Sequence, residues 1–385
     1  MTRHQETPLE GIANPQDRLA QLIWLLDELD ADQENLERLL FGSLADPYPP
    51  VRQRAGKEII DRMTPQRASW LRQLALGESP EDVPAWFPSP TREVQQAAIL
   101  ALRGDHSKDG QDALARLTSH PDADIRYQAL VTLFSLDASD ERLEPLAMQA
   151  YDDRDDEVAM IAAQAASARG WTHHLDAMIK RRESLRGELR LQFTLAIAEL
   201  LPEGERPELV EGIMEELEMG VANEKTSAAC ASALVDVARR HNLVARATHT
   251  LRKELDRWFL HPLLKVEAAA QLTRLGDSRG LDFLSNSFDS RRKDARGYAI
   301  DVAGKFKLGA LYGRVARVAQ DASDYHCDTA ILALSNYNTQ EARELLEELA
   351  TNHADGELRE LAAQALEAPA GVIHTFMGME LASEE

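Results

Sequence analysis

Apolar residues recur at helical spacing in short segments that polar turns separate. A segment near the end of the chain shows the pattern through Leu358, Leu361, Ala362, Ala365 and Leu366. Intervals of three and four place such side chains on one face of an α-helix. A second amphipathic stretch, through Leu345 and Leu349, precedes this one. The pattern predicts pairs of helices.

A short signature marks the second helix of each pair. A polar or acidic turn leads into an aliphatic residue and an arginine at Val51-Arg52, Ile125-Arg126, Leu189-Arg190 and Leu358-Arg359, with variants at Val94, Val158, Thr226, Val266, Ala295 and Cys327. Most steps between these positions are about 30 residues, which is typical of a repeat array. One hairpin of this length cannot bury both of its apolar faces, so neighbouring hairpins must stack. The sequence therefore predicts an all-α solenoid of about ten helical hairpins.

The repeat pattern divides the chain into three parts. We expect a capping region over residues 1–32, the solenoid over residues 33–366, and a C-terminal cap or tail over residues 367–385. The last part carries apolar residues that could cover the open end of the final hairpin or enter a groove of another protein: Val372, Ile373, Phe376 and Met377. Terminal repeats need such a cap, which favours the first alternative.

A proline-rich insertion over residues 78–90 interrupts the array. Four prolines between positions 80 and 90 rule out a regular helix there. Trp86 and Phe87 give the insertion a large apolar tip. Exposed aromatic side chains in a loop are unfavourable unless something covers them. The tip therefore docks on its own solenoid or contacts a partner, and the sequence leaves both alternatives open.

The repeats resemble the HEAT-repeat family, in particular the short bacterial form also found in phycobilisome lyases. The matching segments are Asp122-Ala-Asp-Ile-Arg126 with Ala129-Leu130, and Leu275-Gly-Asp-Ser-Arg-Gly-Leu281. The resemblance covers roughly residues 33–366. It implies that the turn aspartates and the arginines after them are structural, and it carries this role to Asp46, Arg52, Asp122, Arg126, Arg190, Arg296, Asp355 and Arg359.

The charge of the chain bears on its partners. The formal net charge is −22, from 65 acidic and 43 basic residues, so the chain should repel phosphate backbones and anionic lipid. Acidic residues gather between positions 199 and 224, where Glu208, Glu211 and Glu215 predict attraction for a basic region of a protein partner. A local group of arginines and lysine between residues 239 and 257 keeps nucleic-acid binding as a distant alternative.

Candidate chemistry is sparse. The sequence has no phosphate-binding loop, nucleophile elbow or zinc motif. Deoxyhypusine hydroxylase, a HEAT-type enzyme, binds iron through His-Glu pairs. No histidine of this sequence is directly followed by a glutamate, which argues against such an iron site. The segment Asp324, His326, Cys327 and Asp328 is interpreted as a capped helix start, Cys230 as core, and His173-His174 as solvated surface. We expect no catalytic residue, metal or cofactor.

These observations favour a scaffold or adaptor that binds a protein partner along the solenoid. The alternative is a solenoid enzyme or enzyme subunit of lyase type that depends on a bilin or a metal. The first 14 residues show no export-signal pattern, and no apolar run approaches the length of a membrane-spanning helix. We therefore expect a cytoplasmic protein without membrane insertion.

Overall fold

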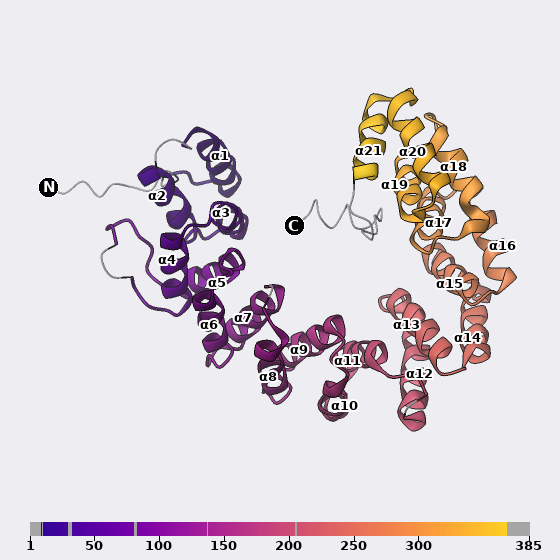
Figure 1. Ribbon diagram of the computed structural model, residues 1–385, viewed down its shortest axis with the longest axis horizontal. Coiled ribbons are helices and arrows are strands. Elements are labelled where there is room, and N and C mark those ends of the chain that lie inside the picture. Colours follow the sequence, from indigo (N-terminus) through magenta and orange to yellow (C-terminus); the bar gives the residue numbers. More distant parts are fainter. Residues whose placement is uncertain are drawn as a thin grey trace. The chain divides into compact units, whose positions relative to one another are not determined.

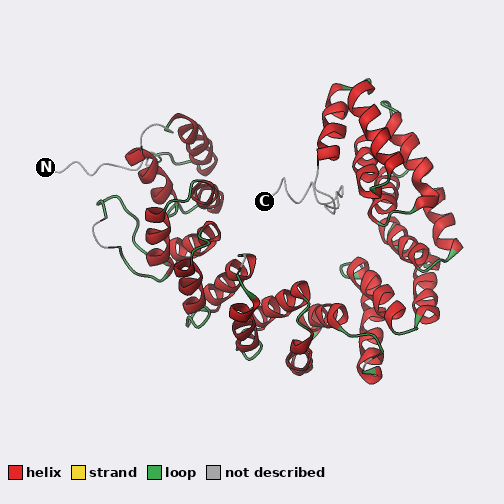
Figure 2. Cartoon of the chain, in the orientation of Figure 1, coloured by secondary structure: helices red, strands yellow, loops and turns green. Residues whose placement is uncertain are grey.

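The structure is a computed structural model. It describes residues 9, 11–29, 33–80, 83–136, 138–204 and 206–367. Within these ranges every regular element is a helix and none is a strand (Figure 2). None of the helices described is long and apolar enough to cross a membrane. The chain forms two compact units, residues 1–200 and residues 201–385, and the repeat pattern did not anticipate this division.

Unit 1 begins with a single helix, α1, which falls in the expected capping region, and continues with five hairpins. Its helices are α1 (Pro15–Glu28), α2 (Gln33–Ser43), α3 (Pro49–Asp61), α4 (Pro65–Ala75), α5 (Arg92–Ala101), α6 (Lys108–Leu117), α7 (Ala123–Ser135), α8 (Asp140–Ala150), α9 (Asp156–Arg169), α10 (Leu175–Ser184) and α11 (Gly187–Leu200). Short 3₁₀ helices, η1 (Leu102–Gly104) and η2 (Thr172–His174), follow α5 and precede α10.

Unit 2 consists of five further hairpins. Its helices are α12 (Pro207–Val221), α13 (Ser227–Arg240), α14 (Val244–Asp256), α15 (Pro262–Arg274), α16 (Ser278–Ser287), α17 (Lys293–Lys305), α18 (Tyr312–Gln320), α19 (Cys327–Tyr337), α20 (Gln340–Asn352) and α21 (Gly356–Glu367). A 3₁₀ helix, η3 (Gly309–Leu311), precedes α18. The apolar C-terminal residues Val372, Ile373, Phe376 and Met377 lie outside the described residues, so their predicted capping role stays a prediction.

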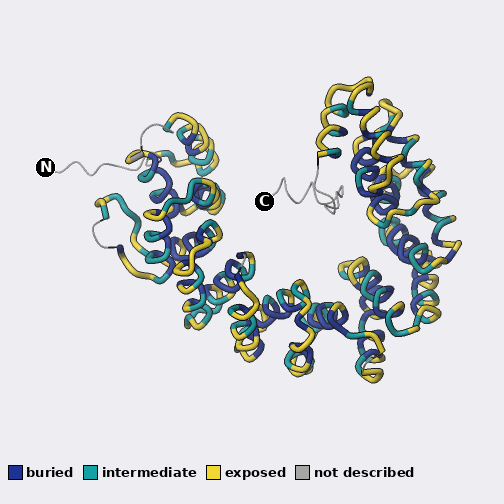
Figure 3. The backbone as a smooth tube through the Cα atoms, viewed as in Figure 1, coloured by how far each residue is buried: buried dark blue, intermediate teal, exposed yellow. Residues whose placement is uncertain are grey.

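The helices from α2 to α21 pair into ten hairpins, as the sequence predicts. In each hairpin the even-numbered helix comes first, and the odd-numbered helix packs against it and against the odd-numbered helices of neighbouring hairpins within the unit (Figure 1). Each repeat signature lies at or near the start of an odd-numbered helix. Buried positions therefore concentrate along these second helices (Figure 3). The all-α solenoid of about ten hairpins is confirmed.

Polar turn residues define where the helices begin. Asp122, Asp155 and Asp277 each accept a hydrogen bond from the backbone N–H two residues on, at 2.9 Å, and so cap α7, α9 and α16. Thr64 caps α4 by accepting from the N–H of Arg67, three residues on, at 3.2 Å, and Pro65 follows it at the first helical position. The recurring acidic turn is thus a helix start that satisfies N–H groups without an intrahelical partner.

Small residues let helices of neighbouring repeats approach closely. A Cβ atom added to Gly304 on α17 would lie 2.6 Å from the Cα and the carbonyl oxygen of Ala333 on α19. A Cβ atom added to Gly280 on α16 would lie 2.4 Å from the carbonyl oxygen of Ala269 on α15. At these two crossings the backbones leave no room for a side chain.

Candidate functional site

Arginines of the second helices bridge consecutive repeats. Arg126 on α7 donates from Nη1 to the carbonyl oxygen of His120 at 2.8 Å, which closes the preceding turn. Its Nε and Nη2 donate to the two carboxylate oxygens of Asp153, in the next repeat, at 2.8 and 2.7 Å. Arg296 makes the equivalent bonds to Phe288 and Asp324. These arginine–aspartate bonds join each of the two hairpins to the next one along the chain.

The other turn residues assigned from the family resemblance lie in related positions. Arg52 donates to the backbone carbonyl of Asp46 at 2.6 Å, and Arg359 donates to that of His353 at 2.6 Å. The carboxylate of Asp355 accepts from the N–H of Glu357 and that of Asp122 from the guanidinium of Arg92. Arg190 lies in the first turn of α11.

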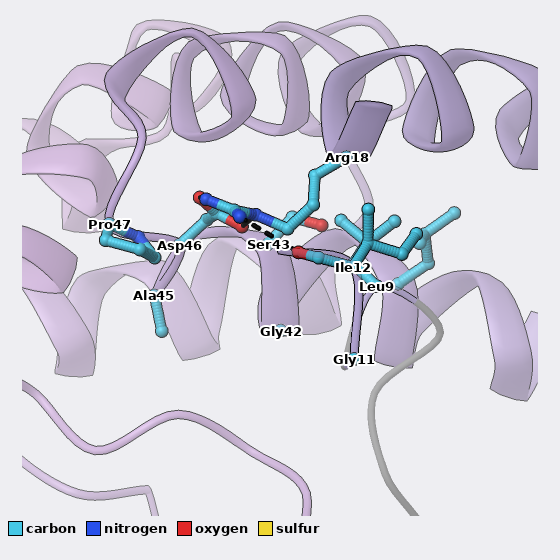
Figure 4. Close-up of a pocket in the computed structure, with 10 residues that line it drawn as sticks. Leu9, Gly11, Ile12, Arg18, Gly42, Ser43, Ala45, Asp46 and Pro47 are labelled. Atoms are coloured by element: carbon cyan, nitrogen blue, oxygen red, sulfur yellow. Dashed lines mark hydrogen bonds and ion pairs between the residues drawn. The ribbon is translucent and has the colours of Figure 1, made fainter. Parts of the chain in front are cut away.

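A cavity of about 370 Å³ adjoins Asp46 at the start of unit 1 (Figure 4). Arg18 from α1 extends across it and donates to both carboxylate oxygens of Asp46, at 2.8 and 3.0 Å. Its Nη1 donates to the carbonyl oxygens of Ile12 and Ala13. Arg18 and Asp46 therefore form an ion pair in this cavity, and the pair joins α1 to the turn after α2.

We expect the substitution Arg126→Ala to destabilise unit 1 by about 1.5 kcal/mol, because it leaves the largely buried Asp153 carboxylate without its charged donor. The backbone of Asp155 also donates to this carboxylate, and burial, which raises the pKa of Asp153, is outweighed by these bonds, so the net pKa is lowered. Thermal unfolding measures the effect. Arg92→Ala, which opens the more exposed pair with Asp122, serves as the control and should lower the melting temperature much less. Equal losses would contradict the proposed bridge.

The tip of the proline-rich insertion packs partly on its own unit. Phe87 stacks on Phe41 of α2 with ring centroids 5.1 Å apart and meets Trp70 of α4 edge-on at 5.2 Å. Trp86 has one ring neighbour, Phe87, at 6.0 Å. Both side chains are half-buried. The Phe87 contacts correspond to the self-docking alternative, and partner binding by Trp86 and Phe87 stays a prediction.

The acidic residues of α12 divide into free and paired groups. Glu208 and Glu215 are exposed. Glu211 is also exposed but accepts from Arg246 of α14 at 2.7 Å. Arg246 binds Glu218 more closely through Nε and Nη2, at 2.7 and 2.9 Å. The hydrogen bonds to Glu218 raise the pKa of Arg246, and those from Arg246 lower the pKa of Glu218.

The most exposed aromatic side chains described lie in the loop between α14 and α15, at a site that the sequence analysis missed. Trp258 and Phe259 are 85% and 93% exposed. Buried leucines flank them at positions 255 and 260. Arg257 donates to the carboxylate of Glu254 at 2.6 Å and to the carbonyl oxygen of Ala222, which ends α12, at 3.3 Å. The buried leucines and the bonds of Arg257 thus hold the loop against unit 2, while both aromatic rings stay exposed to solvent.

A groove of about 720 Å³ runs between α12 and α14. It is lined by Glu215, Glu218, Met219, Ala222, Arg246, His249, Thr250, Lys253 and Glu254. Met219 on its rim is 67% exposed. We call the groove, the exposed acids of α12 and the loop that carries Trp258 and Phe259 the α12–α14 surface.

The arginines near this surface do not form a free basic patch. Arg252 pairs with Asp277 at 2.6 Å, and Arg240 donates to the carbonyl oxygen of Leu201 at 2.8 Å. Arg239 donates to the carbonyl oxygen of Arg274. These guanidinium groups are thus held by bonds within unit 2, and the α12–α14 surface combines exposed carboxylates and apolar side chains with Arg246 and Lys253 in the groove.

The segment from Asp324 to Asp328 does not converge on a common point. The ring of His326 packs over Gly297 of α17, while the Cys327 thiol lies 3.2 Å from the carbonyl oxygen of Ala319 and 3.5 Å from Nε2 of His353. Burial, together with nearby carboxylates, raises the pKa of Cys327 to about 11, so the thiol stays protonated at neutral pH. Burial also raises the pKa of Cys230, which is fully buried.

The expectation that His173 and His174 are solvated surface is wrong for His174. Its ring is fully buried between Tyr151 and Trp171, whereas the side chain of His173 is 58% exposed. The 3₁₀ turn η2 folds His174 inward, which adjacent sequence positions alone could not indicate. Burial lowers the pKa of His174, and His173 lowers it further. Together with Glu144, the two histidines form a group of potential metal ligands among the described residues.

Repeated helical hairpins that bury a common core define a helical repeat protein, and comparison with known families identifies the type of repeat. The model of HEAT repeats matches residues 85–167 in unit 1 and residues 281–367 in unit 2. The chain therefore carries HEAT repeats in both units, and the family assignment made from the sequence is confirmed. The more specific likeness to phycobilisome lyases stays a prediction.

Solved structures with similar architecture are remote in sequence. Human deoxyhypusine hydroxylase is 15% identical, with a TM-score of 0.30 over 80% of this chain and 98% of that chain. Kap95p, from a complex with RanGDP, is 14% identical, with a TM-score of 0.44 over 97% of this chain. Kap121p is 11% identical, with a TM-score of 0.46 over 92% of this chain. The chain spans 57% of Kap95p and 43% of Kap121p. No curated protein matches the sequence, and likenesses this distant carry no information about function.

Proposed function

We propose that this HEAT-repeat protein is an adaptor that binds a protein partner, and that the partner docks on the α12–α14 surface. The observation that carries the proposal is the pair Trp258 and Phe259, adjacent and almost fully exposed on a loop with buried flanks. A monomeric protein gains nothing from holding two large aromatic rings in water, whereas tryptophan and other large side chains dominate the binding energy of interfaces.

The chemistry of the surface indicates the chemistry of the partner. The aromatic pair lies near the end of α12, because Arg257 joins their loop to Ala222. Along α12, the exposed carboxylates of Glu208, Glu211 and Glu215 give one face a negative potential. A partner segment with apolar side chains next to lysine or arginine would complement both features. We expect it to be cytoplasmic, as the sequence analysis predicts for this chain.

The double substitution Trp258→Ser, Phe259→Ser tests the proposal. Proteins that co-purify with the full chain from native lysate are identified by mass spectrometry, and the affinity of the purified partner is then measured by calorimetry. We expect the double variant to bind at least about thirtyfold more weakly, which corresponds to about 2 kcal/mol, with an unchanged melting temperature. Tyr325→Ser, at another exposed aromatic of unit 2, is the matched control and should keep its affinity.

Salt provides a second arm of the same experiment. If the acids of α12 attract a basic partner, its affinity should fall as salt rises from about 50 to 500 mM, because exposed charges are screened within roughly 10 Å at 0.1 M. A double variant with full affinity would refute the proposed docking surface. Salt-independent binding would instead assign the acids of α12 to solubility and restrict the interface to the aromatic pair.

A further inference from the structure

Three side chains with metal-binding atoms meet on unit 1, whereas the proposed partner surface belongs to unit 2. Glu144 comes from α8, and His173 and His174 come from η2, at the start of the next hairpin. One carboxylate oxygen and one imidazole nitrogen from each histidine lie within 4.8 Å of one another. Nε2 of His173 is 3.1 Å from Oε2 of Glu144.

The hydrogen bonds of His174 indicate which of its nitrogens is available. Tyr151 donates its single hydroxyl hydrogen to the carbonyl oxygen of Ala162, at 3.3 Å. The same hydroxyl oxygen lies 3.1 Å from Nδ1 of His174 and can therefore accept a hydrogen bond from it. This arrangement places the ring hydrogen on Nδ1 and a lone pair on Nε2. Nε2 is buried and has no hydrogen-bond partner among the residues that the structure describes.

Nε2 of His241 and of His326 is also buried without a partner among the described residues, but His174 is the histidine of these three that is grouped with two further potential metal ligands. A histidine that binds a metal through one nitrogen commonly holds its other nitrogen in a hydrogen bond, which fixes the tautomer and the orientation of the ring. The bond from Nδ1 of His174 to Tyr151 has this form. His173 and Glu144 also place potential ligand atoms within 4.8 Å of this histidine, which a structural role of the buried ring alone would not require.

We infer that Glu144, His173 and His174 bind one divalent transition-metal ion, with His174 as the buried ligand. Two imidazoles and one carboxylate form a set that suits Zn²⁺ and its neighbours, whereas Mg²⁺ and Ca²⁺ prefer oxygen ligands. Ligand atoms around a tetrahedral Zn²⁺ stand about 3.4 Å apart, given bonds of about 2.0–2.1 Å. The side chains of His173 and Glu144 are 58% and 32% exposed, so both can rotate to close the site.

A purely structural role is the competing explanation, and the array itself provides the means to separate the two. Elsewhere in unit 1 an arginine on a first helix pairs with a carboxylate about one repeat earlier, as Arg67 does with Glu37 and Arg142 with Asp112. His173 and Glu144 have the same relation, 29 residues apart. The substitution His173→Arg should therefore preserve an inter-repeat ion pair while it removes a metal ligand.

The test measures Zn²⁺ binding to the full chain after treatment with a chelator, by titration calorimetry with ZnCl₂. We expect one site per chain in the wild type, and a loss of affinity of at least about a hundredfold in His173→Arg and in Glu144→Gln. Both variants should keep their helical content and melting temperature without metal. His106→Arg, at another exposed histidine of unit 1, should bind Zn²⁺ as the wild type does.

One spectroscopic and one thermal measurement complement the calorimetry. Co²⁺ added in place of Zn²⁺ should give visible absorption of a low-coordinate site in the wild type and in His106→Arg, and this absorption should be absent in His173→Arg. Zn²⁺ should raise the melting temperature of the same two proteins, because a ligand that binds the folded state stabilises it. Undiminished Zn²⁺ binding by His173→Arg, or no saturable binding by the wild type, would overturn the inference and leave an inter-repeat hydrogen bond as the role of His173.

Discussion

Gly304→Val should lower the melting temperature of unit 2 by roughly 6–12 °C, one of the two largest effects that we expect from a single substitution. The new Cβ would lie 2.6 Å from the Cα and carbonyl oxygen of Ala333, closer than real Cβ atoms approach backbone. The helices α17 and α19 would have to separate along the buried row of second helices. Overpacking of this kind costs about 3 kcal/mol or more, and for a unit of nearly 200 residues each kcal/mol shifts the melting temperature by about 2–4 °C.

Gly313→Ala supplies the matched control for this experiment. Gly313 lies inside α18, and a Cβ added there would have no other atom within 4 Å. Alanine favours the helix by up to about 1 kcal/mol over glycine, so this variant should melt at the same or a slightly higher temperature. Differential scanning calorimetry follows both variants. If Gly304→Val melted like the wild type, the close crossing of α17 and α19 would be wrong.

Phe87→Ala should destabilise unit 1 by about 3 kcal/mol, or roughly 6–12 °C. Its ring joins Phe41 and Trp70 in an aromatic cluster, and truncation removes its contacts with these two rings and with Trp86. The prolines around Phe87 restrict the loop in the unfolded state too, so less conformational entropy is lost when the loop folds. Thermal unfolding of the full chain, followed by circular dichroism, measures the loss.

Trp86→Ala separates packing from partner binding in the same insertion. Among the described residues the ring of Trp86 pairs with Phe87 alone, so its truncation should lower the melting temperature much less than Phe87→Ala does. Binding of the partner identified through the α12–α14 surface should change little in either variant once folding is allowed for. A loss of binding by Trp86→Ala without a loss of stability would make the insertion a partner contact, the alternative that the sequence left open.

Local features of the sequence were sufficient for the hairpins. The spacing of apolar residues within one helix and the turn between two helices are properties of about 30 consecutive residues, and the repeat signature places them in register. The acidic turns were recognisable for the same reason, because an N-cap bonds to N–H groups only two or three residues away. The number of hairpins therefore followed from the sequence.

Whether an aromatic side chain is packed or exposed depended on the tertiary structure. The sequence contains two Trp-Phe pairs, each followed by a proline within three residues, at positions 86–87 and 258–259. Phe87 is packed because Phe41 and Trp70 lie beside it, while the other pair has no aromatic neighbour in the part of the chain that the structure describes and stays in water. The second pair could have been noticed by this repeated dipeptide, but its exposure could not have been inferred.

The same reason explains the histidines. Their adjacency suggested surface residues, yet His174 is buried because Tyr151 and Trp171 enclose it, and Glu144 reaches His173 from the preceding hairpin. The burial of a side chain and the distances between candidate metal ligands both depend on residues from different repeats. The sequence by itself determined which segments are helical and how often they recur, because those properties are local. Only the packing of one hairpin on the next decided which aromatic side chains are buried and which polar groups meet.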